Sequence, residues 1–429
     1  MKNARFADLF AGIGGMRLGF QNACKKLGVG SECVFASEIK PHAVKVYGQN
    51  FDEEKVSGDI AQIDAKSLSD FDFLLAGFPC QAFSAAGKRM GFLDTRGTLF
   101  FEIGRILSEK QPQGFLLENV EGLVGHDKES KQDKIGRTLS TILAVLEELG
   151  YRTEWRVLNS KDFGVPQDRR RIYIAGAKKR APNMDSFSTS RKNVSAILET
   201  GLACEESGFV TRLLSRYKTG ELYGKAIKDK RGGKSNIHSW DMELKGEVSD
   251  DQKTLMNSLL KERRKKKWAA DYGIDWMDGM PLTLRHIETF FQHPNLEEML
   301  EDLAAKGYLR KEHPKKKLNG RRVQDRTLPL GYNIVAGKMS FEISKVLDPN
   351  GVAPTLVAMD MKSIYVTDGG GLRKLSLSEG LGLFGFPDGF KFDIERELGY
   401  DLLGNTVAVP VVSAVAERLL EACFEGDEM

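Results

Sequence analysis

The chain has few cysteines, and their spacing does not match a common metal or disulfide site. Its five cysteines are scattered through 429 residues, with no CxxC pair and no histidine pair nearby, at positions Cys24, Cys33, Cys80, Cys204 and Cys423. This spacing argues against a zinc site and against a disulfide framework. We therefore expect no bound metal ion.

Long apolar runs and a signal-peptide pattern are also absent. No run approaches the roughly 20 residues that cross a bilayer, and the segment from Met1 to Phe6 leads directly into a strand pattern. These absences predict a cytosolic protein without a membrane partner. The net charge of +3 says little, because 63 basic residues nearly balance 60 acidic ones.

Basic residues are nevertheless concentrated in the second half of the chain, in residues 261–267, 315–317 and 321–322. Such runs fit a polyanion, although they are also typical of solvated surfaces. In the same region, Leu284–Phe291 and Leu296–Ala304 have the apolar spacing of helices. A basic stretch follows them, which predicts a winged-helix element near residues 281–326; simple packing of two amphipathic helices explains the spacing equally well.

The first part of the chain alternates strand and helix patterns, which predicts an α/β fold with a doubly wound, mostly parallel sheet. The strand Phe6–Phe10 opens into a glycine turn at residues 11–15, and a helical pattern follows through Lys26. A dinucleotide fingerprint needs a third glycine at position 17, where this chain has Arg17. The sequence therefore disfavours a nicotinamide cofactor.

Acidic residues follow the next two predicted strands. Glu38 can accept hydrogen bonds from ribose hydroxyls, and Asp59 can accept one from an adenine amino group. Each alone is typical of an ordinary loop acid. Their joint position favours an adenosine-type cofactor without a pyrophosphate.

A cysteine follows the apolar run of residues 71–76. Gly77 allows a sharp exit from the strand and Pro79 fixes the backbone, so the Cys80 thiol is directed to the carboxyl edge of the sheet. The alternative is a buried structural cysteine. The following segment, Ala82–Thr98, contains glycines, serines and basic residues, which predicts a mobile loop able to fold over an anion.

Two further segments place polar groups at the same edge. Glu118 follows a strand, where shielding from water favours its neutral, proton-donating form, although a capping or ion-paired glutamate is as common. Alternate residues of an extended segment share a face, so Gln167, Arg169 and Arg171 should point together toward a phosphate or an anionic intermediate.

In this order, the segments resemble the motifs of the DNA cytosine-5 methyltransferases of bacterial restriction–modification systems. The resemblance covers the chain to about Gly176 and again from about Pro354. It implies S-adenosylmethionine as cofactor, bound by Phe10, Gly12, Ile13, Gly14, Glu38, Ile39, Asp59, Ile60, Pro79, Leu99, Asn405 and Val407. It implies Cys80, Glu118 and Arg169 as catalytic residues, and Gln81, Ser84, Asn119, Val120, Gln167 and Arg171 as substrate-binding residues.

The resemblance also implies an architecture and a reaction. It places a Rossmann-like catalytic domain at residues 1–180, a smaller target-recognition domain at 181–395 and a segment at 396–429 that packs back on the catalytic domain. The Cys80 thiolate should add to carbon 6 of a cytosine flipped out of a specific double-stranded DNA sequence, so that carbon 5 can accept the methyl group. We expect a monomer associated with the bacterial nucleoid, paired in function with a restriction endonuclease.

Three residues depart from the motifs of this family. Gly382 and Phe384 stand where Arg and Gln are usual, and Thr406 replaces Ser or Ala. The first two could loosen support between the domains or contact with the DNA backbone. A cytosine-5 methyltransferase acting on transfer RNA, or a catalytically silent DNA-binding protein, remains an alternative from the sequence.

Overall fold

A computed structural model describes residues 2–51, 56–79, 99–130, 132–229, 236–275, 279–318, 321–335 and 341–424. The chain forms two compact units. The first comprises Met1–Glu199, Pro349–Lys362 and Leu375–Met429, and the second comprises Thr200–Asp348 and Ser363–Lys374. Unit 1 thus includes residues 181–199, 349–362 and 375–395, which the sequence analysis assigned to the recognition part.

Unit 1 is built on a seven-stranded sheet in the order β3-β2-β1-β4-β5-β7-β6. The strands are β1 (Asn3–Leu9), β2 (Gly30–Ser37), β3 (Val56–Ser57), β4 (Phe73–Gly77), β5 (Gly114–Val120), β6 (Arg152–Asn159) and β7 (Arg170–Ala177). Pairing is parallel from β3 to β5, and β7 is antiparallel to both β5 and β6. The strand order reverses between β1 and β4, and such a switch point opens a crevice at the carboxyl edge of a sheet.

Helices cover both faces of this sheet because successive strand residues are apolar on both sides. In β4, Phe73 and Leu75 belong to one buried cluster, whereas Leu74 and Ala76 belong to the other. The helices are α1 (Gly15–Lys26), α2 (Pro41–Asn50), α3 (Leu99–Lys110), α4 (Arg137–Glu148), α11 (Ala358–Met361), α12 (Leu377–Gly382), α13 (Arg396–Asn405) and α14 (Val409–Phe424).

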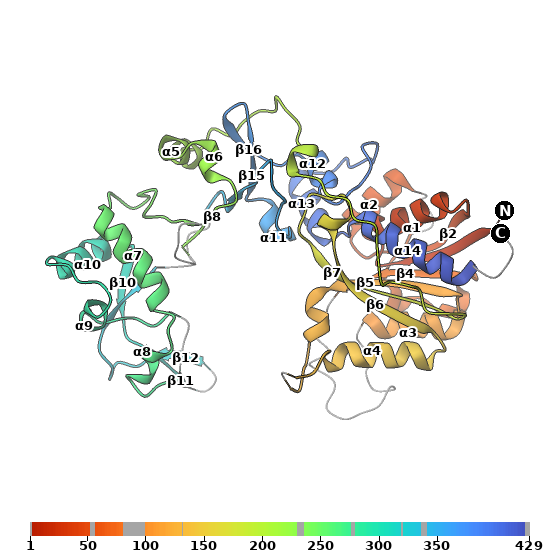
Figure 1. The fold of residues 1–429 in the computed structure, drawn as a ribbon, viewed down its shortest axis with the longest axis horizontal. Coiled ribbons are helices and arrows are strands. Elements are labelled where there is room, and N and C mark those ends of the chain that lie inside the picture. The colour runs from red at the N-terminus through yellow and green to blue at the C-terminus, as the bar shows by residue number, and fades with distance from the viewer. Residues whose placement is uncertain are drawn as a thin grey trace. The chain divides into compact units, whose positions relative to one another are not determined.

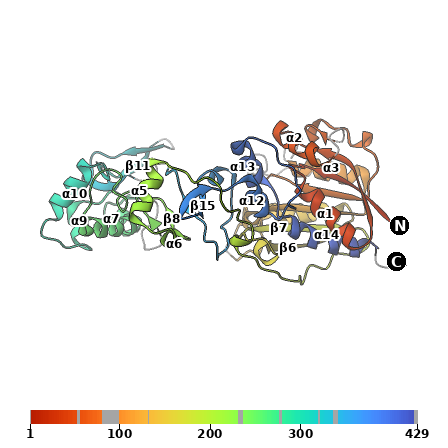
Figure 2. The ribbon, with the colours of Figure 1, turned by 90° about the horizontal axis from the view of Figure 1, so that it is seen from above.

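The last helix completes the first core. Helix α14 lies alongside α1 in both views, on the face opposite α3 and α4 (Figure 1 and Figure 2). Its Val412, Val415 and Leu419 are fully buried in the same cluster as Phe20 of α1. The predicted doubly wound, mostly parallel α/β fold is confirmed.

Unit 2 contains a five-stranded sheet and a separate helical part. Its sheet has the order β16-β15-β14-β8-β9. Its elements are α5 (Gly208–Arg216), α6 (Thr219–Leu222), β8 (Ala226–Ile227), β9 (Asn236–Ile237), α7 (Asp250–Glu262), α8 (Lys267–Ala270), α9 (Leu284–Glu288), α10 (Leu296–Ala305), β10 (Leu309–Glu312), β11 (Lys315–Leu318), β12 (Arg321–Gln324), β13 (Gly331–Ile334), β14 (Lys345–Val346), β15 (Ile364–Asp368) and β16 (Gly371–Lys374).

The helical part is a module of helices and two antiparallel strand pairs. After α7, Leu282 makes two backbone hydrogen bonds with Tyr332 of β13, at 3.0 and 2.8 Å, and then α9 and α10 follow. Strand β10 pairs antiparallel with β13, and between them β11 and β12 form an antiparallel hairpin. We call this hairpin, residues 315–318 and 321–324, the wing.

Within the described ranges, no helix has the length and apolarity required to cross a membrane.

Candidate active site

A cavity of about 570 Å³ lies at the carboxyl edge of the sheet in unit 1. Its volume falls within the range of about 300–1,000 Å³ that is usual for small-molecule sites. The predicted site residues that line it are Phe10, Gly12, Ile13, Glu38, Ile39, Asp59, Ile60, Pro79, Leu99, Glu118, Asn119, Val120, Arg169, Arg171 and Asn405. The strand ends after β1, β2, β4 and β5 thus meet at one cavity.

The turn after β1 forms the floor at one end. Phe10 has a φ of +55°, which is uncommon for a residue with a side chain, and Gly12 and Gly14 have φ values of +55° and +88°. An added Cβ on Gly14 would lie 2.2 Å from the Phe51 ring, so only glycine fits there. This conformation lets the backbone approach a ligand closely just before α1 begins at Gly15.

Glu38 connects this turn to the loop after β2. Its Oε2 accepts a 2.9 Å hydrogen bond from the Gly12 amide, and its Oε1 accepts bonds from the Ile39 and Lys40 amides, both at 2.8 Å. A carboxylate has lone pairs for about four hydrogen bonds, so acceptor capacity remains for hydroxyl groups of a ligand.

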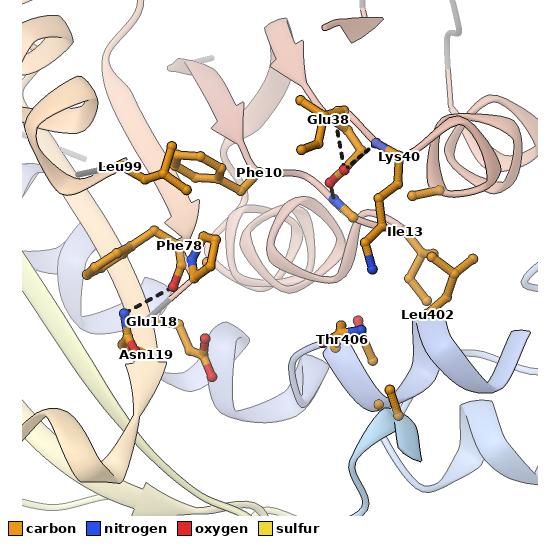
Figure 3. A pocket seen from close by; sticks show the side chains of 18 of the residues that line it. Phe10, Ile13, Glu38, Lys40, Phe78, Leu99, Glu118, Asn119, Leu402 and Thr406 are labelled. Atoms are coloured by element: carbon orange, nitrogen blue, oxygen red, sulfur yellow. Dashed lines mark hydrogen bonds between the residues drawn. The ribbon is translucent and has the colours of Figure 1, made fainter. Parts of the chain in front are cut away.

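Apolar side chains line the cavity together with Glu38 and Asp59. Ile39 leaves 68% of its surface exposed, which is unusual for isoleucine, and it lines the cavity together with Phe10 and Leu99. Figure 3 shows the Phe10 and Leu99 side chains among those that line the cavity. Asp59 Oδ1 caps the short helix Ile60–Gln62 through the Ala61 amide at 3.0 Å, which leaves Oδ2 as an acceptor. A flat apolar ring with a polar edge fits this end of the cavity.

The sequence analysis missed part of the cavity wall. Lys40 lines the cavity and forms an ion pair with Asp401, with 2.8 Å between Nζ and Oδ2, and Leu402 and Thr406 also line it (Figure 3). The missed residues are Ser37, Lys40, Ala43, Gly58, Gly77, Phe78, Val357, Ala358, Leu402, Gly404 and Thr406. Most of them lie next to predicted motif residues in the sequence, and this position could have indicated that they line the cavity. Val357 and Ala358 are not next to any predicted residue.

Glu118 and Asn119 form the other end of the cavity. Asn119 donates a 3.0 Å hydrogen bond from Nδ2 to the Phe78 carbonyl and accepts one from the Val120 amide at 2.8 Å (Figure 3). It thereby fixes the backbone that leads through Pro79 to position 80. The Glu118 side chain is 10% exposed, and its Oε1 lies 3.2 Å from Arg171 Nε.

Burial and neighbouring charges act in opposite directions on the pKa of the Glu118 carboxyl. Burial raises the pKa of this carboxyl above its ordinary value of 4.5, although Arg171 and Arg169 act in the opposite direction. Because burial is the largest effect, the neutral acid is stabilised beside two guanidinium groups. A group in this state can donate a proton or a hydrogen bond to a ligand in the cavity.

Arg169 holds the cavity wall together. Its Nη1 donates to the Leu356 carbonyl at 2.9 Å, and its Nη2 donates to the carbonyls of Thr406 at 2.8 Å and Gly404 at 3.3 Å. Its guanidinium carbon lies 5.2 Å from the centre of the Phe384 ring, so the unusual phenylalanine stabilises the cation. Burial and the charge of Arg171 lower the pKa of Arg169 from 12.5 to about 10.

Gln167 acts behind this wall and does not line the cavity. It is fully buried; its Nε2 donates to the Leu383 carbonyl at 2.7 Å and its Oε1 accepts from the Leu356 amide at 3.2 Å. Gly14 and Val407 are likewise absent from the lining among the described residues. The predicted shared face is therefore divided: Arg169 and Arg171 reach the cavity, whereas Gln167 supports it.

Cys80, Gln81 and Ser84, with the predicted loop of residues 82–98, lie outside the described residues. None of the other four cysteines lines the cavity, and three of them are buried. Burial raises the thiol pKa of Cys24 and of Cys423 to about 12 and also raises that of Cys33. Cys204 belongs to unit 2, where its Sγ donates to the Asp368 carbonyl at 3.2 Å.

In the part of the chain that the structure describes, no cluster of three or more His, Cys, Asp or Glu side chains could hold a metal ion.

Comparisons with known proteins agree on one family. The sequence profile of the C-5 cytosine-specific DNA methylases matches residues 4–421. The chain is 59% identical over 420 residues to the Type II methyltransferase M.NlaIV of Neisseria lactamica, covering 98% of this chain and 99% of the relative. It is 43% identical over 452 residues to the Type II methyltransferase M.HgiCI of Herpetosiphon aurantiacus, covering 98% and 100%. A crystal structure of a Spodoptera frugiperda DNMT2 variant shares the fold, with a TM-score of 0.50 and 18% identity over 98% of this chain and 100% of that one.

Proposed function

Because the chain belongs to the C-5 cytosine-specific DNA methylases, we propose that it methylates carbon 5 of a flipped-out cytosine within a specific double-stranded DNA sequence. The proposal is carried by one observation: the same cavity contains two subsites. Phe10 and Glu38 line a subsite suited to an adenosine group, and the Glu118 carboxyl and the Arg171 guanidinium line the other. The two subsites bring a methyl donor and a base into one enclosure.

The first subsite fits S-adenosylmethionine. Glu38 offers carboxylate lone pairs to the ribose hydroxyls, and Asp59 Oδ2 is available to the adenine amino group. Phe10, Ile39 and Leu99 supply apolar surfaces for the purine ring. When bound, the cofactor supplies an electrophilic sulfonium methyl group; the protein orients it and excludes water.

Cys80 is the nucleophile in this proposal. Carbon 5 of cytosine reacts with a methyl donor only after a thiolate has added to carbon 6 and made the ring electron-rich. Pro79 lines the cavity, Cys80 follows it directly, and none of the other four cysteines is among the lining residues. After methyl transfer, the proton on carbon 5 leaves and the sulfur is eliminated, which restores the free thiolate.

Glu118 is the acid that responds to the charge created by thiolate addition. Its raised pKa keeps a proton available for ring nitrogen 3 of cytosine. Arg171, with its Nε 3.2 Å from the Glu118 carboxyl, is the guanidinium best situated to contact the base and the developing charge. Arg169 adds positive potential and keeps the wall in place, since its Nη atoms already bond three carbonyls.

We further propose that unit 2 selects the DNA sequence and that the enzyme protects bacterial DNA from a cognate restriction endonuclease. The near full-length similarity to Type II methyltransferases supports this role. In this account the enzyme acts as a cytoplasmic monomer on nucleoid DNA.

The direct test is methyl transfer from labelled S-adenosylmethionine to unmethylated duplex DNA of mixed sequence, followed by bisulfite sequencing. Protection at one recurring sequence context is expected, with none from a Cys80→Ala variant that still binds the cofactor. Labelling of transfer RNA in a parallel reaction, with no labelling of DNA, would overturn the duplex substrate.

A further inference from the structure

The wing is a strand pair whose charged residues are all basic. Strands β11 and β12 have the sequences KKKL and RRVQ, which together contain five basic residues and no acid. Lys315 pairs with Glu312 at 3.8 Å and Lys316 pairs with Asp325 at 3.0 Å. Among the described residues, Lys317, Arg321 and Arg322 have no ion-pair partner within 4.0 Å.

The hairpin register places two of these free cations directly against each other. Lys317 is opposite Arg322, and the neighbouring pair on the same face is Lys315 with Gln324. Like charges directly opposite each other destabilise a strand pair. A bound polyanion would relieve the repulsion between the Lys317 and Arg322 side chains.

The other basic run of the module, residues 261–267, contains an acid and makes contacts inside the module. Glu262 forms ion pairs with Lys265 and with Lys267, and Arg263 donates a hydrogen bond to the Asn333 side chain. Many residues of 261–267 thus have partners inside the module. The wing strands, by contrast, contain no acid.

Helix α10 has the opposite character. In winged-helix proteins this position belongs to the helix that reads the major groove with its N-terminal residues. Here α10 carries four acids and no base in the sequence LEEMLEDLAA, and Glu297 and Glu298 in its first turn are exposed. Carboxylates at those positions would face phosphates with the same charge.

We propose that the wing binds the DNA sugar-phosphate backbone through Lys317, Arg321 and Arg322, and that α10 stays out of the groove. The inference rests on the proposed function, because it takes duplex DNA as the partner. It assigns this module to affinity and not to base reading, since phosphate contacts carry no sequence information directly.

The test is the salt dependence of DNA binding by the full chain, measured with the Lys317→Thr/Arg322→Thr variant. Each phosphate contact contributes about 0.9 to the slope of log K against log salt concentration, so the slope should become shallower by about 1.8. Affinity should fall by the same factor for duplexes with and without the methylated sequence. Threonine suits exposed strands, and Lys317→Gln/Arg322→Gln should give the same slope if the first variant folds poorly.

The matched control is Lys265→Ala/Lys267→Ala, which removes two lysines outside the wing that both form ion pairs with Glu262. Its slope should equal that of the unchanged chain. An unchanged slope in both wing variants would overturn the wing contact. Because binding is measured without methyl transfer, a chain that binds with these slopes but transfers no methyl group would contradict the proposed function and not the wing.

A second arm tests α10. In Glu297→Gln/Glu298→Gln, the sequence context protected in bisulfite sequencing should stay the same. A changed context would mean that α10 contacts bases, which would overturn its exclusion from the groove.

Discussion

The burial of one carboxyl group, that of Glu118, affects both the stability of the fold and the proposed reaction. Its pKa is raised, so over a range above 4.5 the folded chain binds a proton that the unfolded chain has released. The free energy of unfolding therefore falls as pH rises through that range. The site retains the carboxyl in spite of this cost, as expected of a functional acid.

The Glu118→Gln variant separates stability from activity. Glutamine is neutral at every pH, so the variant should gain thermal stability relative to the unchanged chain as pH rises above 4.5. Methyl transfer should fall by roughly 10²–10⁴-fold because the proton donor is lost. Thermal unfolding and labelled methyl transfer measure the two effects.

Glu121→Gln is the control. Glu121 directly follows β5, and its carboxylate forms an exposed ion pair with Arg170 at the start of β7. This variant should change neither quantity strongly. Growing instability of Glu118→Gln toward pH 8 would show that the Arg171 ion pair outweighs burial.

Glu38→Ala should weaken cofactor binding. A hydrogen bond to a charged group contributes about 1.5–3 kcal/mol, which corresponds to about 10- to 150-fold in affinity. Calorimetric titration with S-adenosylmethionine measures it, with Glu32→Ala as control because Glu32 is a surface residue 3.9 Å from Arg5. Equal affinity of Glu38→Ala and the unchanged chain would refute the ribose contact.

At the residue scale, motif residues at strand ends were predictable because a strand end fixes where the next side chain lies. Glu38 and Glu118 line the cavity for that reason. The structural use of Gln167 and Arg169 was not predictable, because their partners Leu356 and Leu383 are distant in sequence.

At the scale of elements, α13 and the segment before α11 meet at Gly404. An added Cβ there would lie 2.1 Å from the Ala358 nitrogen, so the two backbones can approach only at a glycine. This contact brings Val357 and Ala358 into the cavity wall beside Thr406.

Gly404→Ala should lower both stability and cofactor affinity. In an unhindered helix alanine is about 1 kcal/mol more favourable than glycine. A lower stability of the Gly404→Ala variant would therefore result from the clash between the added Cβ and the Ala358 backbone. Thermal unfolding and cofactor titration are the measurements. Gly220→Ala in α6, where no atom lies within 4 Å of the added Cβ, is the control and should not destabilise; equal behaviour of the two variants would contradict the close approach.

The spacing of apolar residues predicted whether a segment forms a helix or a strand. It did not always predict the residue at which the helix or strand ends. The predicted helix Leu284–Phe291 ends at Glu288 as α9, because a turn follows in which the Phe290 and Phe291 amides both bond to the Ile287 carbonyl. The pairing of β10 with β13 around the wing was not predictable, since it joins strands separated by another hairpin.

At the scale of the whole molecule, unit 1 is discontinuous in sequence. Helix α14 fills the core beside α1, and residues 349–362 supply part of the cavity wall. The family resemblance implied that residues 396–429 pack back on the catalytic domain. The sequence did not predict that residues 349–362 belong to unit 1, because this segment has no periodicity and is held by hydrogen bonds to the buried Gln167 and Arg169.

The central claim is covalent catalysis by Cys80, and a mechanism-based trap tests it most directly. Duplex DNA synthesised with 5-fluorocytosine in place of cytosine has no proton on carbon 5 to release, so a sulfur adduct should persist after methyl transfer. Incubation with S-adenosylmethionine, denaturation and peptide mapping by mass spectrometry would locate the attachment. We predict a methylated adduct on Cys80 alone; attachment at another residue, or no adduct by a chain that methylates ordinary DNA, would contradict the mechanism.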